Sequence, residues 1–314
     1  HKGRNLAHHS QIDGWRDIRM TKQKMDTNWL VFHSKPKTPN FVLPDGAVDA
    51  HCHVFGPSPE FPFAPERKYT PCNAGKDDLF SLRDHLGFSR NVIVQATCHG
   101  NDNSAMLDAC RTGGDLTRGI ASVGADITLE ELAEMHDAGV RGVRFNFVKR
   151  LVDATPKEIF IAIAEKIQEF GWSIVVYFEA TDLEELKPFL KQLPGIVVVD
   201  HMGRPDVTKG VDHPDFTQFI DLMAKNENIW TKVTCPERLT ATDAPYDDVV
   251  PYYQAIVDRF EDRVLWGTDW PHPNMKTHAP DDGLLVDRIP HIARTAELQQ
   301  KLLIDNPMRL YWGA

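Results

Sequence analysis

The sequence is poor in cysteine, in net positive charge and in long apolar runs. Five of its 314 residues are cysteine, and no two form a Cys-x-x-Cys pair. This pattern predicts reduced thiols in a cytoplasmic protein, and neither a disulfide framework nor a zinc knuckle. The formal net charge of −10 argues against nucleic acid and anionic membranes as partners. No apolar run approaches the roughly 20 residues that cross a bilayer. We therefore expect a small-molecule partner, with the oligomeric state left open.

The first 44 residues differ from the rest of the chain. They are polar, are interrupted by Pro36, Pro39 and Pro44, and show no sustained period. We expect an N-terminal leader or extension here, of which the first 19 or so residues, before Met20, are upstream or artificial sequence. The remaining residues 45–314 are predicted to form one domain, because 42 % hydrophobic residues can fill one large core.

Short β-rich runs alternate with stretches of helical spacing from residue 45 onward. The predicted strands cover 47–51, 91–97, 118–123, 141–147, 173–179, 195–201, 229–234 and 263–268. The predicted helices cover 77–88, 102–111, 128–138, 156–170, 183–192, 214–226 and 246–261. Eight strands that alternate with helices favour a TIM-type (β/α)8 barrel over a doubly wound open sheet. The open sheet is also weakened as a nucleotide binder, since no Gly-x-Gly-x-x-Gly follows a strand.

Polar side chains gather at the predicted carboxyl ends of these strands, where the active site of such a barrel forms. His51 and His53 are two residues apart at the end of the first strand, so both point to the same face. Asp269 follows the eighth strand. The other candidates at strand ends are Thr97, His99, Arg144, Asn146, Arg150, Tyr177, His201, Arg204, Arg238, His272 and Asn274. Their convergence at one rim predicts a hydrolytic centre.

Four arginines in this set indicate the class of substrate. Arg144, Arg150, Arg204 and Arg238 lie at or just after strand ends in a chain that is acidic as a whole. The guanidinium fork matches a carboxylate or phosphate in a bidentate manner. Surface salt bridges would explain one or two of them at little energetic gain. We therefore predict a small substrate with two or more carboxylates.

The predicted chemistry needs a base and an electrophilic group. Asp269 can take a proton from water, although a carboxylate there could instead cap the following loop. His51, His53 and His201 can donate to a developing oxyanion or, together with Asp269, bind one zinc ion. A two-metal site is disfavoured because Arg144 occupies the place where a bridging ligand would lie. We expect no cofactor, with a single Zn²⁺ as the alternative.

Several segments resemble the amidohydrolase superfamily and, within it, the 2-pyrone-4,6-dicarboxylate lactonases. They are residues 49–57 (DAHCHVFGP), 91–100 (NVIVQATCHG), 141–147 (RGVRFNF), 149–153 (KRLVD), 200–206 (DHMGRPD) and 266–274 (WGTDWPHPN). His-x-His alone would indicate only the superfamily. Its combination with Arg-x-x-x-x-x-Arg and the Asp-His-Met-Gly-Arg block is far more specific. The resemblance spans about residues 45–312.

The resemblance implies a metal-independent hydrolysis that opens the lactone ring of 2-pyrone-4,6-dicarboxylate reversibly to 4-oxalomesaconate. This reaction belongs to bacterial protocatechuate 4,5-cleavage in lignin-aromatic catabolism. By the same resemblance, Asp269 activates water and the histidines His51, His53 and His201 polarise the lactone carbonyl. The four arginines hold the substrate carboxylates. The positions that shape the pocket are Tyr69, Thr97, His99, Tyr177 and Asn274.

Three alternatives remain at this stage. The first is a hydrolase or isomerase for another carboxylated lactone, such as a sugar-acid lactone or muconolactone. The second is a hydrolase with one zinc ion. The third is a non-catalytic barrel that binds dicarboxylates. The combination of Asp269 with His51 and His53 argues against it, because a binding protein needs no base opposite a polarising group.

Overall fold

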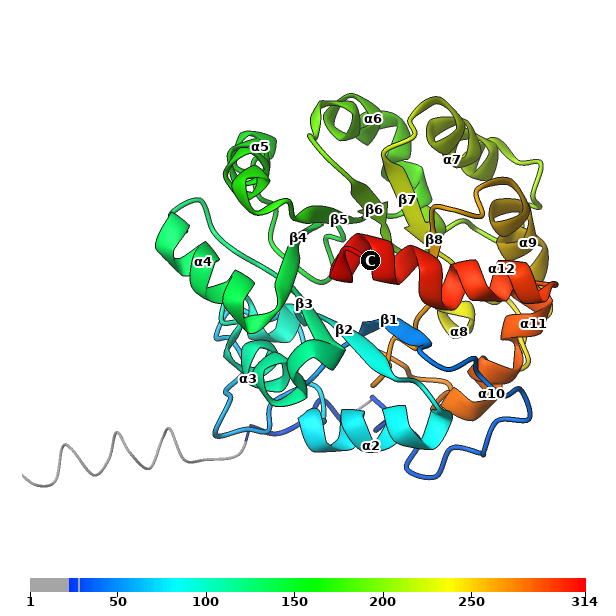
Figure 1. The fold of residues 1–314 in the computed structure, drawn as a ribbon, viewed down its shortest axis with the longest axis horizontal. Coiled ribbons are helices and arrows are strands. Elements are labelled where there is room, and N and C mark those ends of the chain that lie inside the picture. The colour runs from blue at the N-terminus through cyan, green and yellow to red at the C-terminus, as the bar shows by residue number, and fades with distance from the viewer. Residues whose placement is uncertain (1–22, 28) are drawn as a thin grey trace, which may run out of the picture.

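The computed structural model describes residues 23–27 and 29–314, and its centre is an eight-stranded parallel sheet (Figure 1). Each strand pairs with the next one along the chain. The strands are β1 (Val48–Cys52), β2 (Arg90–Val94), β3 (Thr117–Ala121), β4 (Val140–Asn146), β5 (Ser173–Tyr177), β6 (Val197–Val199), β7 (Ile229–Lys232) and β8 (Val264–Leu265). All eight fall where the sequence predicts a strand, so the (β/α)8 barrel is confirmed and the open sheet is not.

Helices surround the strands as an outer layer (Figure 1). The main ones are α2 (Lys76–Leu86), α3 (Ser104–Gly113), α4 (Leu129–Ala138), α5 (Lys157–Lys166), α6 (Leu183–Gln192), α7 (Pro214–Lys225) and α9 (Val250–Arg259). Shorter helices follow the later strands: α8 (Pro236–Leu239), α10 (Asp282–Asp287), α11 (Ile289–Ile292) and α12 (Ala296–Gln300). Local sequence explains the bounds of several. Thr128 and Glu131 form a capping box at the start of α4, and Gly139 ends it at φ 115°.

The barrel closes between β1 and the residues that follow β8. The Ala50 N–H donates to the Trp266 carbonyl at 2.9 Å, and the Asp269 N–H donates to the His51 carbonyl at 2.8 Å. Gly267 lies at this joint, and a Cβ there would be 2.4 Å from the backbone nitrogen of His51. A side chain at this position would therefore push the two ends of the sheet apart.

One end of the barrel is covered by the C-terminal segment, which crosses it in Figure 1. Tyr311 packs with the inward-facing apolar side chains of the strands, and its carbonyl accepts a hydrogen bond from Arg118 Nε at 3.0 Å. Arg118 lies at the start of β3, so the covered end is the amino end of the strands. The carboxyl ends, which carry the candidate residues, lie at the opposite mouth.

The described residues before 45 lie against the barrel. The Leu30 N–H donates to the Met275 carbonyl at 2.9 Å, and Lys37 Nζ pairs with Asp287 at 2.5 Å. This segment therefore contacts the loop after β8 and helix α10. The boundary predicted at residue 45 stays a prediction, and the expected leader up to residue 19 lies outside the described residues.

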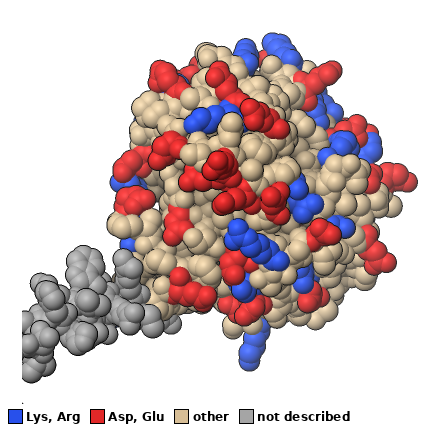
Figure 2. Space-filling view, turned by 60° about the vertical axis from the view of Figure 1, so that its left-hand side comes forward, with Lys and Arg blue, Asp and Glu red and all other residues tan. Residues whose placement is uncertain are grey.

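Side-chain chemistry on the surface is mixed. Figure 2 shows Lys and Arg side chains interspersed with Asp and Glu over one face. All five cysteines belong to the described part of the chain, where each is a free thiol. Within the same residues, none of the helices has both the length and the apolar character that crossing a membrane requires.

Candidate active site

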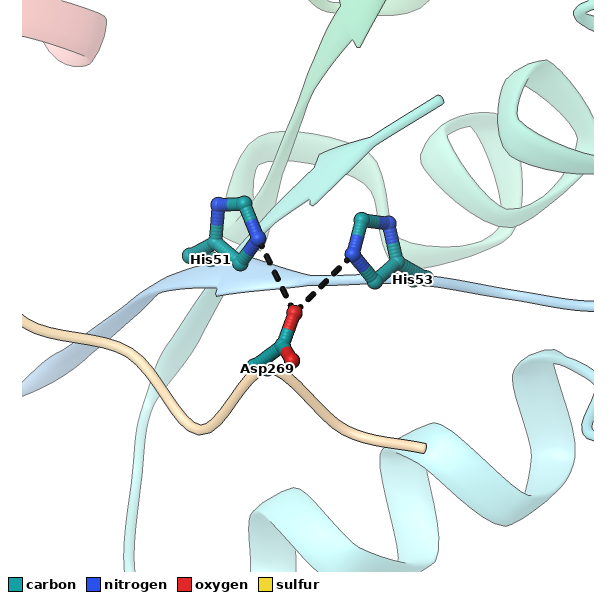
Figure 3. Close-up of side chains that lie close together, drawn as sticks. All are labelled: His51, His53 and Asp269. Atoms are coloured by element: carbon teal, nitrogen blue, oxygen red, sulfur yellow. Dashed lines mark hydrogen bonds and ion pairs between the residues drawn. The ribbon is translucent and has the colours of Figure 1, made fainter. Parts of the chain in front are cut away.

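His51, His53 and Asp269 meet at the joint between β1 and β8 (Figure 3). Alternation along β1 sends both imidazoles to the inner face. His51 Nε2 and His53 Nε2 each lie 3.2 Å from Asp269 Oδ1. The aspartate has a left-handed backbone conformation, with φ 60°. This conformation, together with the hydrogen bond from its N–H to His51, directs the carboxylate back over the end of β1.

The second oxygen of Asp269 holds an arginine. Arg238 Nε donates to Asp269 Oδ2 at 2.9 Å, and Arg238 Nη2 donates to the Pro273 carbonyl. Burial alone would raise the pKa of Asp269, but the guanidinium and the hydrogen bonds from the two histidines hold it well below its usual value. Asp269 is therefore an ionised carboxylate whose oxygens are all engaged by cationic or N–H groups.

His51 has a buried lysine behind it. Lys232, at the end of β7, places Nζ 2.8 Å from His51 Nδ1 and 2.8 Å from Asp200 Oδ1. Burial, reinforced by the positive charge of Lys232, lowers the pKa of His51 well below its usual value. His51 is therefore a neutral imidazole.

The other two predicted histidines are held by their Nδ1 atoms. His53 Nδ1 donates to the Val94 carbonyl at 2.7 Å, which leaves Nε2 directed at Asp269. His201 Nδ1 lies 2.5 Å from Thr234 Oγ1, and burial lowers its pKa to about 3. Both rings therefore present Nε2 to the interior of the site in a fixed orientation.

Arg144 is a buried side chain with a carboxylate partner of its own. Its Nε and Nη2 lie 2.8 and 2.7 Å from Asp200 Oδ2. Its guanidinium carbon also lies 4.7 Å from the centre of the Tyr177 ring. The charges of Arg144 and Lys232 together hold the pKa of Asp200 well below its usual value, although burial opposes this.

Arg150 and Arg204 lie nearer the solvent. Arg150 Nε is 3.6 Å from Glu179 Oε1, and both side chains are 44 % exposed, so this pair is weak. Arg204 Nη1 donates to the Tyr177 hydroxyl at 2.8 Å. The structure thus gives the four predicted arginines different surroundings, with Arg150 the most available to a ligand.

Most of the predicted residues line one cavity above Asp269. Its walls are formed by His53, Tyr69, Ala96, Thr97, Arg144, Arg150, Leu151, Tyr177, His201, Arg238, Asp269, Pro273 and Asn274. Segments that are far apart in the sequence therefore come together as predicted. A second cavity of about 360 Å³ adjoins it and shares Thr97, Arg144 and Leu151 as wall residues. This larger space does not contain the carboxylate, so we place the candidate chemistry in the smaller one.

The wall of this cavity lacks five of the predicted residues: His51, His99, Asn146, Arg204 and His272. Asn146 lines the adjoining larger cavity instead. His51 lies behind the smaller cavity, in contact with the wall residues Asp269, His53 and His201. Arg204 lines a separate surface hollow and contacts the cavity through Tyr177. His99 is 2 % exposed; its Nε2 accepts from the Gly56 N–H at 3.0 Å and its Nδ1 donates to the Pro62 carbonyl at 3.1 Å. Both His99 nitrogens are therefore occupied by backbone, and this side chain holds a loop and does not face a ligand.

Reasoning from the sequence missed Lys232 as part of the site. The sequence did contain a signal, since Lys232 falls in a short β-rich run of a barrel whose strands are otherwise apolar. A lysine that is fully buried requires a polar partner, so its position on a strand indicates a buried polar contact. It also missed the setting of His272, which lies between Glu237 Oε1 at 3.1 Å and Asp282 Oδ1 at 2.7 Å. This buried cluster joins helix α8, which carries Arg238, to the loop that carries Asp269 and to α10.

Three of the four residues predicted as possible zinc ligands lie close together, but their donor atoms are already engaged. His51, His53 and Asp269 each offer a ligand atom within 4.8 Å of the others. However, Asp269 Oδ2 holds Arg238, and His51 Nδ1 faces the ammonium of Lys232. A ligating imidazole usually donates its other N–H to an acceptor, which an ammonium group is not. As arranged, this group does not fit a divalent cation.

Comparisons with known proteins agree with this geometry. The sequence matches a 2-pyrone-4,6-dicarboxylate hydrolase of Comamonas testosteroni at 62 % identity, over 93 % of this chain and 99 % of that protein. It matches a 4-sulfomuconolactone hydrolase of Hydrogenophaga intermedia at 36 % identity, over 86 % and 90 %. A crystal structure of a probable 2-pyrone-4,6-dicarboxylic acid hydrolase from Acinetobacter baumannii with citric acid bound aligns with a TM-score of 0.74 at 28 % identity, over 85 % and 99 %.

The sequence model of the Amidohydrolase family matches residues 48–312, which is nearly the whole barrel. The resemblance inferred from the sequence motifs is thereby confirmed. The chain belongs to the amidohydrolase family.

Proposed function

We propose that this protein is a lactonase that hydrolyses 2-pyrone-4,6-dicarboxylate to 4-oxalomesaconate. One observation carries the proposal: an ionised aspartate, two Nε2 atoms and three guanidinium groups border a single cavity. This arrangement suits a flat lactone with two carboxylates. The 62 % identity to a hydrolase named for this substrate supports the same choice.

Ring opening begins with water at the Asp269 carboxylate. Asp269 accepts a proton from the water, whose oxygen attacks the lactone carbonyl carbon. His201 and His53 line the cavity, where an Nε2 that carries a proton can donate to the oxyanion that develops. For His53 this requires a doubly protonated ring, because its Nδ1 donates to the Val94 carbonyl. For His201 this requires the Thr234 hydroxyl to donate to Nδ1, which the 2.5 Å separation allows. The bond to the ring oxygen then breaks, the leaving enolate oxygen takes the proton held by Asp269, and the resulting enol tautomerises to the ketone of the product.

Proton transfer at Asp269 involves His53. Its Nδ1 already donates to the Val94 carbonyl, so its contact with Asp269 Oδ1 is a hydrogen bond only when Nε2 also carries a proton. The Nε2 position is therefore where a proton can pass between the base and its neighbour during the reaction.

Substrate binding would change the partners of Arg238. In the free protein this guanidinium holds Asp269 as a weak base. A substrate carboxylate in the cavity would compete with Asp269 for the same N–H groups. Binding would then raise the basicity of Asp269 at the moment when water is to be deprotonated. Arg150 contributes a second anion contact near the cavity entrance, because its partner Glu179 holds it only weakly.

The proposed reaction uses no metal ion. The support is the engagement of the donor atoms described above, in particular the cations at Asp269 and His51. A lactone carbonyl polarised by imidazole N–H groups does not need a Lewis acid. The coarser assignment, hydrolysis of a small carboxylated lactone, does not depend on this point.

The test is an ultraviolet assay of chelator-treated, dialysed protein with 2-pyrone-4,6-dicarboxylate. We expect the absorbance of the pyrone to fall at the same rate before and after chelation, and added zinc to give no increase. A carboxylated muconolactone serves as the comparison substrate. Faster turnover of that compound would reassign the substrate, and activity that requires zinc would contradict the metal-free mechanism.

The role of Asp269 has its own test. We expect Asp269→Asn to lower kcat by about 10²–10⁴-fold, because the general base is lost. Substrate affinity should stay within a few-fold, since the arginines remain. Steady-state kinetics and equilibrium binding to the inactive variant measure the two effects. A variant with near wild-type kcat would show that another group is the base.

A further inference from the structure

Lys232 lies outside the roles that the proposed reaction assigns. The side chain is 0 % exposed and is not part of the cavity wall, so it does not meet substrate. Its Nζ lies 2.8 Å from both His51 Nδ1 and Asp200 Oδ1. Asp200 in turn is paired with Arg144 at 2.7 Å. Burial of a lysine this deep in the protein is energetically unfavourable unless its ammonium group is paired with other polar groups.

The hydrogen-bonding capacity of an ammonium group decides the state of the imidazole next to it. An ammonium has three N–H donors and no lone pair, so it can only donate to His51 Nδ1. Nδ1 must then be the unprotonated nitrogen of the neutral ring, and the ring proton is on Nε2. His51 Nε2 lies 3.2 Å from Asp269 Oδ1, which accepts this proton in a hydrogen bond.

We propose that Lys232 is a positioning residue that locks His51 in the Nε2–H tautomer, so that His51 donates to Asp269. Its consequence for catalysis rests on the proposed function, whereas the tautomer itself does not. The contacts form one line from β7 through β1 to the loop after β8. Lys232 holds His51, and His51 holds one oxygen of Asp269 while Arg238 holds the other. Both oxygens of the carboxylate are thereby held by a donor.

A simpler role, in which Lys232 only neutralises Asp200, explains less of the geometry. Asp200 Oδ2 already receives Nε and Nη2 of Arg144, at 2.8 and 2.7 Å. A second cation at Asp200 alone would not need to lie at hydrogen-bond distance from His51 as well. Without the ammonium, His51 Nδ1 could carry the proton toward Asp200 Oδ1, which is 3.6 Å away. Nε2 would then face Asp269 with a lone pair, which is repulsive.

The direct test is nitrogen-15 NMR of the histidine side chains in the resting wild-type protein, with His51 assigned by comparison with a His51→Asn sample. We expect the Nδ1 signal of an unprotonated ring nitrogen and the Nε2 signal of a protonated one. The reverse pattern would overturn the proposal. This measurement needs no substrate, so it stands whether or not the lactonase assignment holds.

The second test compares Lys232→Met with Thr231→Val. Thr231 precedes Lys232 on β7, is equally buried, and donates to the Val199 carbonyl at 2.7 Å, so its variant reports general damage to this strand. We expect Lys232→Met to shift the ring proton toward Nδ1 and to lower kcat about 10–100-fold, as loss of a group that orients a histidine commonly does. KM should change less than about threefold, since Lys232 does not touch substrate.

Thr231→Val should keep the wild-type tautomer and kcat. If Lys232→Met retains the wild-type tautomer, or raises KM while kcat is unchanged, the positioning role is wrong. If this variant does not fold, the spectrum of the wild-type protein decides the question alone.

Discussion

Removal of Arg238 should change the pH dependence of the enzyme as well as its affinity. Arg238 Nε lies 2.9 Å from Asp269 Oδ2, and only about a tenth of the Arg238 side chain is exposed. Two opposite unit charges about 4 Å apart attract each other by about 4 kcal/mol at an effective dielectric constant of about 20. Loss of this attraction would let Asp269 hold a proton roughly 10²–10³-fold more tightly.

The direction of the effect follows from which form is active. A base must be ionised, and Arg238 favours the ionised form by lowering the pKa of Asp269. In Arg238→Met the pKa therefore rises, and the acid limb of kcat/KM moves to higher pH. The assay is a series of kcat/KM values across the acid range with 2-pyrone-4,6-dicarboxylate, at constant ionic strength.

Arg150→Met is the matched control. Arg150 lines the same cavity but pairs with Glu179 at 3.6 Å and does not contact Asp269. Both variants lose one contact to a substrate carboxylate, worth about 1.5–3 kcal/mol, so both should raise KM. Only Arg238→Met should move the acid limb. Superimposable pH profiles for Arg238→Met and the wild-type protein would refute the assignment of Asp269 as a base controlled by Arg238.

Two further predictions concern stability. Burial alone would lower the pKa of His272, but the carboxylates of Asp282 and Glu237 raise it to about 10. The stabilisation from this ion cluster is therefore complete below the ordinary histidine pKa of about 6.5. It is lost as the pH rises through about 10. Urea unfolding of the wild-type protein across this range should show a falling free energy of unfolding that His272→Gln lacks; parallel curves would contradict it. Gly267→Ala should lower the midpoint of thermal unfolding and reduce the free energy of unfolding by about 1–3 kcal/mol or more, because the new Cβ would lie 2.4 Å from the backbone nitrogen of His51. A midpoint equal to that of the wild-type protein would show that the closure of the barrel is not tight there.

The barrel and the approximate place of its functional rim follow from the order of strands and helices in the sequence. Buried strands such as Val197–Val199 are apolar throughout because helices cover the barrel, and this run identifies a strand without any tertiary information. Polar residues directly after such strands, including His53 and Asp269, must then share one mouth. The order of strands and helices along the chain thus predicts the approximate position of the site.

Tertiary structure alone decided how each polar group is paired. Arg144 and Arg238 were both predicted to hold substrate carboxylates, and the structure adds that each is paired with an internal carboxylate, Asp200 or Asp269. His99 was predicted to shape the pocket, and two backbone groups occupy its ring instead. Residue type and strand position give the direction of a side chain, whereas its partner depends on distances of a few ångströms between segments hundreds of residues apart. For the same reason the lysine behind His51 was found only once β7 and β1 were placed together inside the barrel.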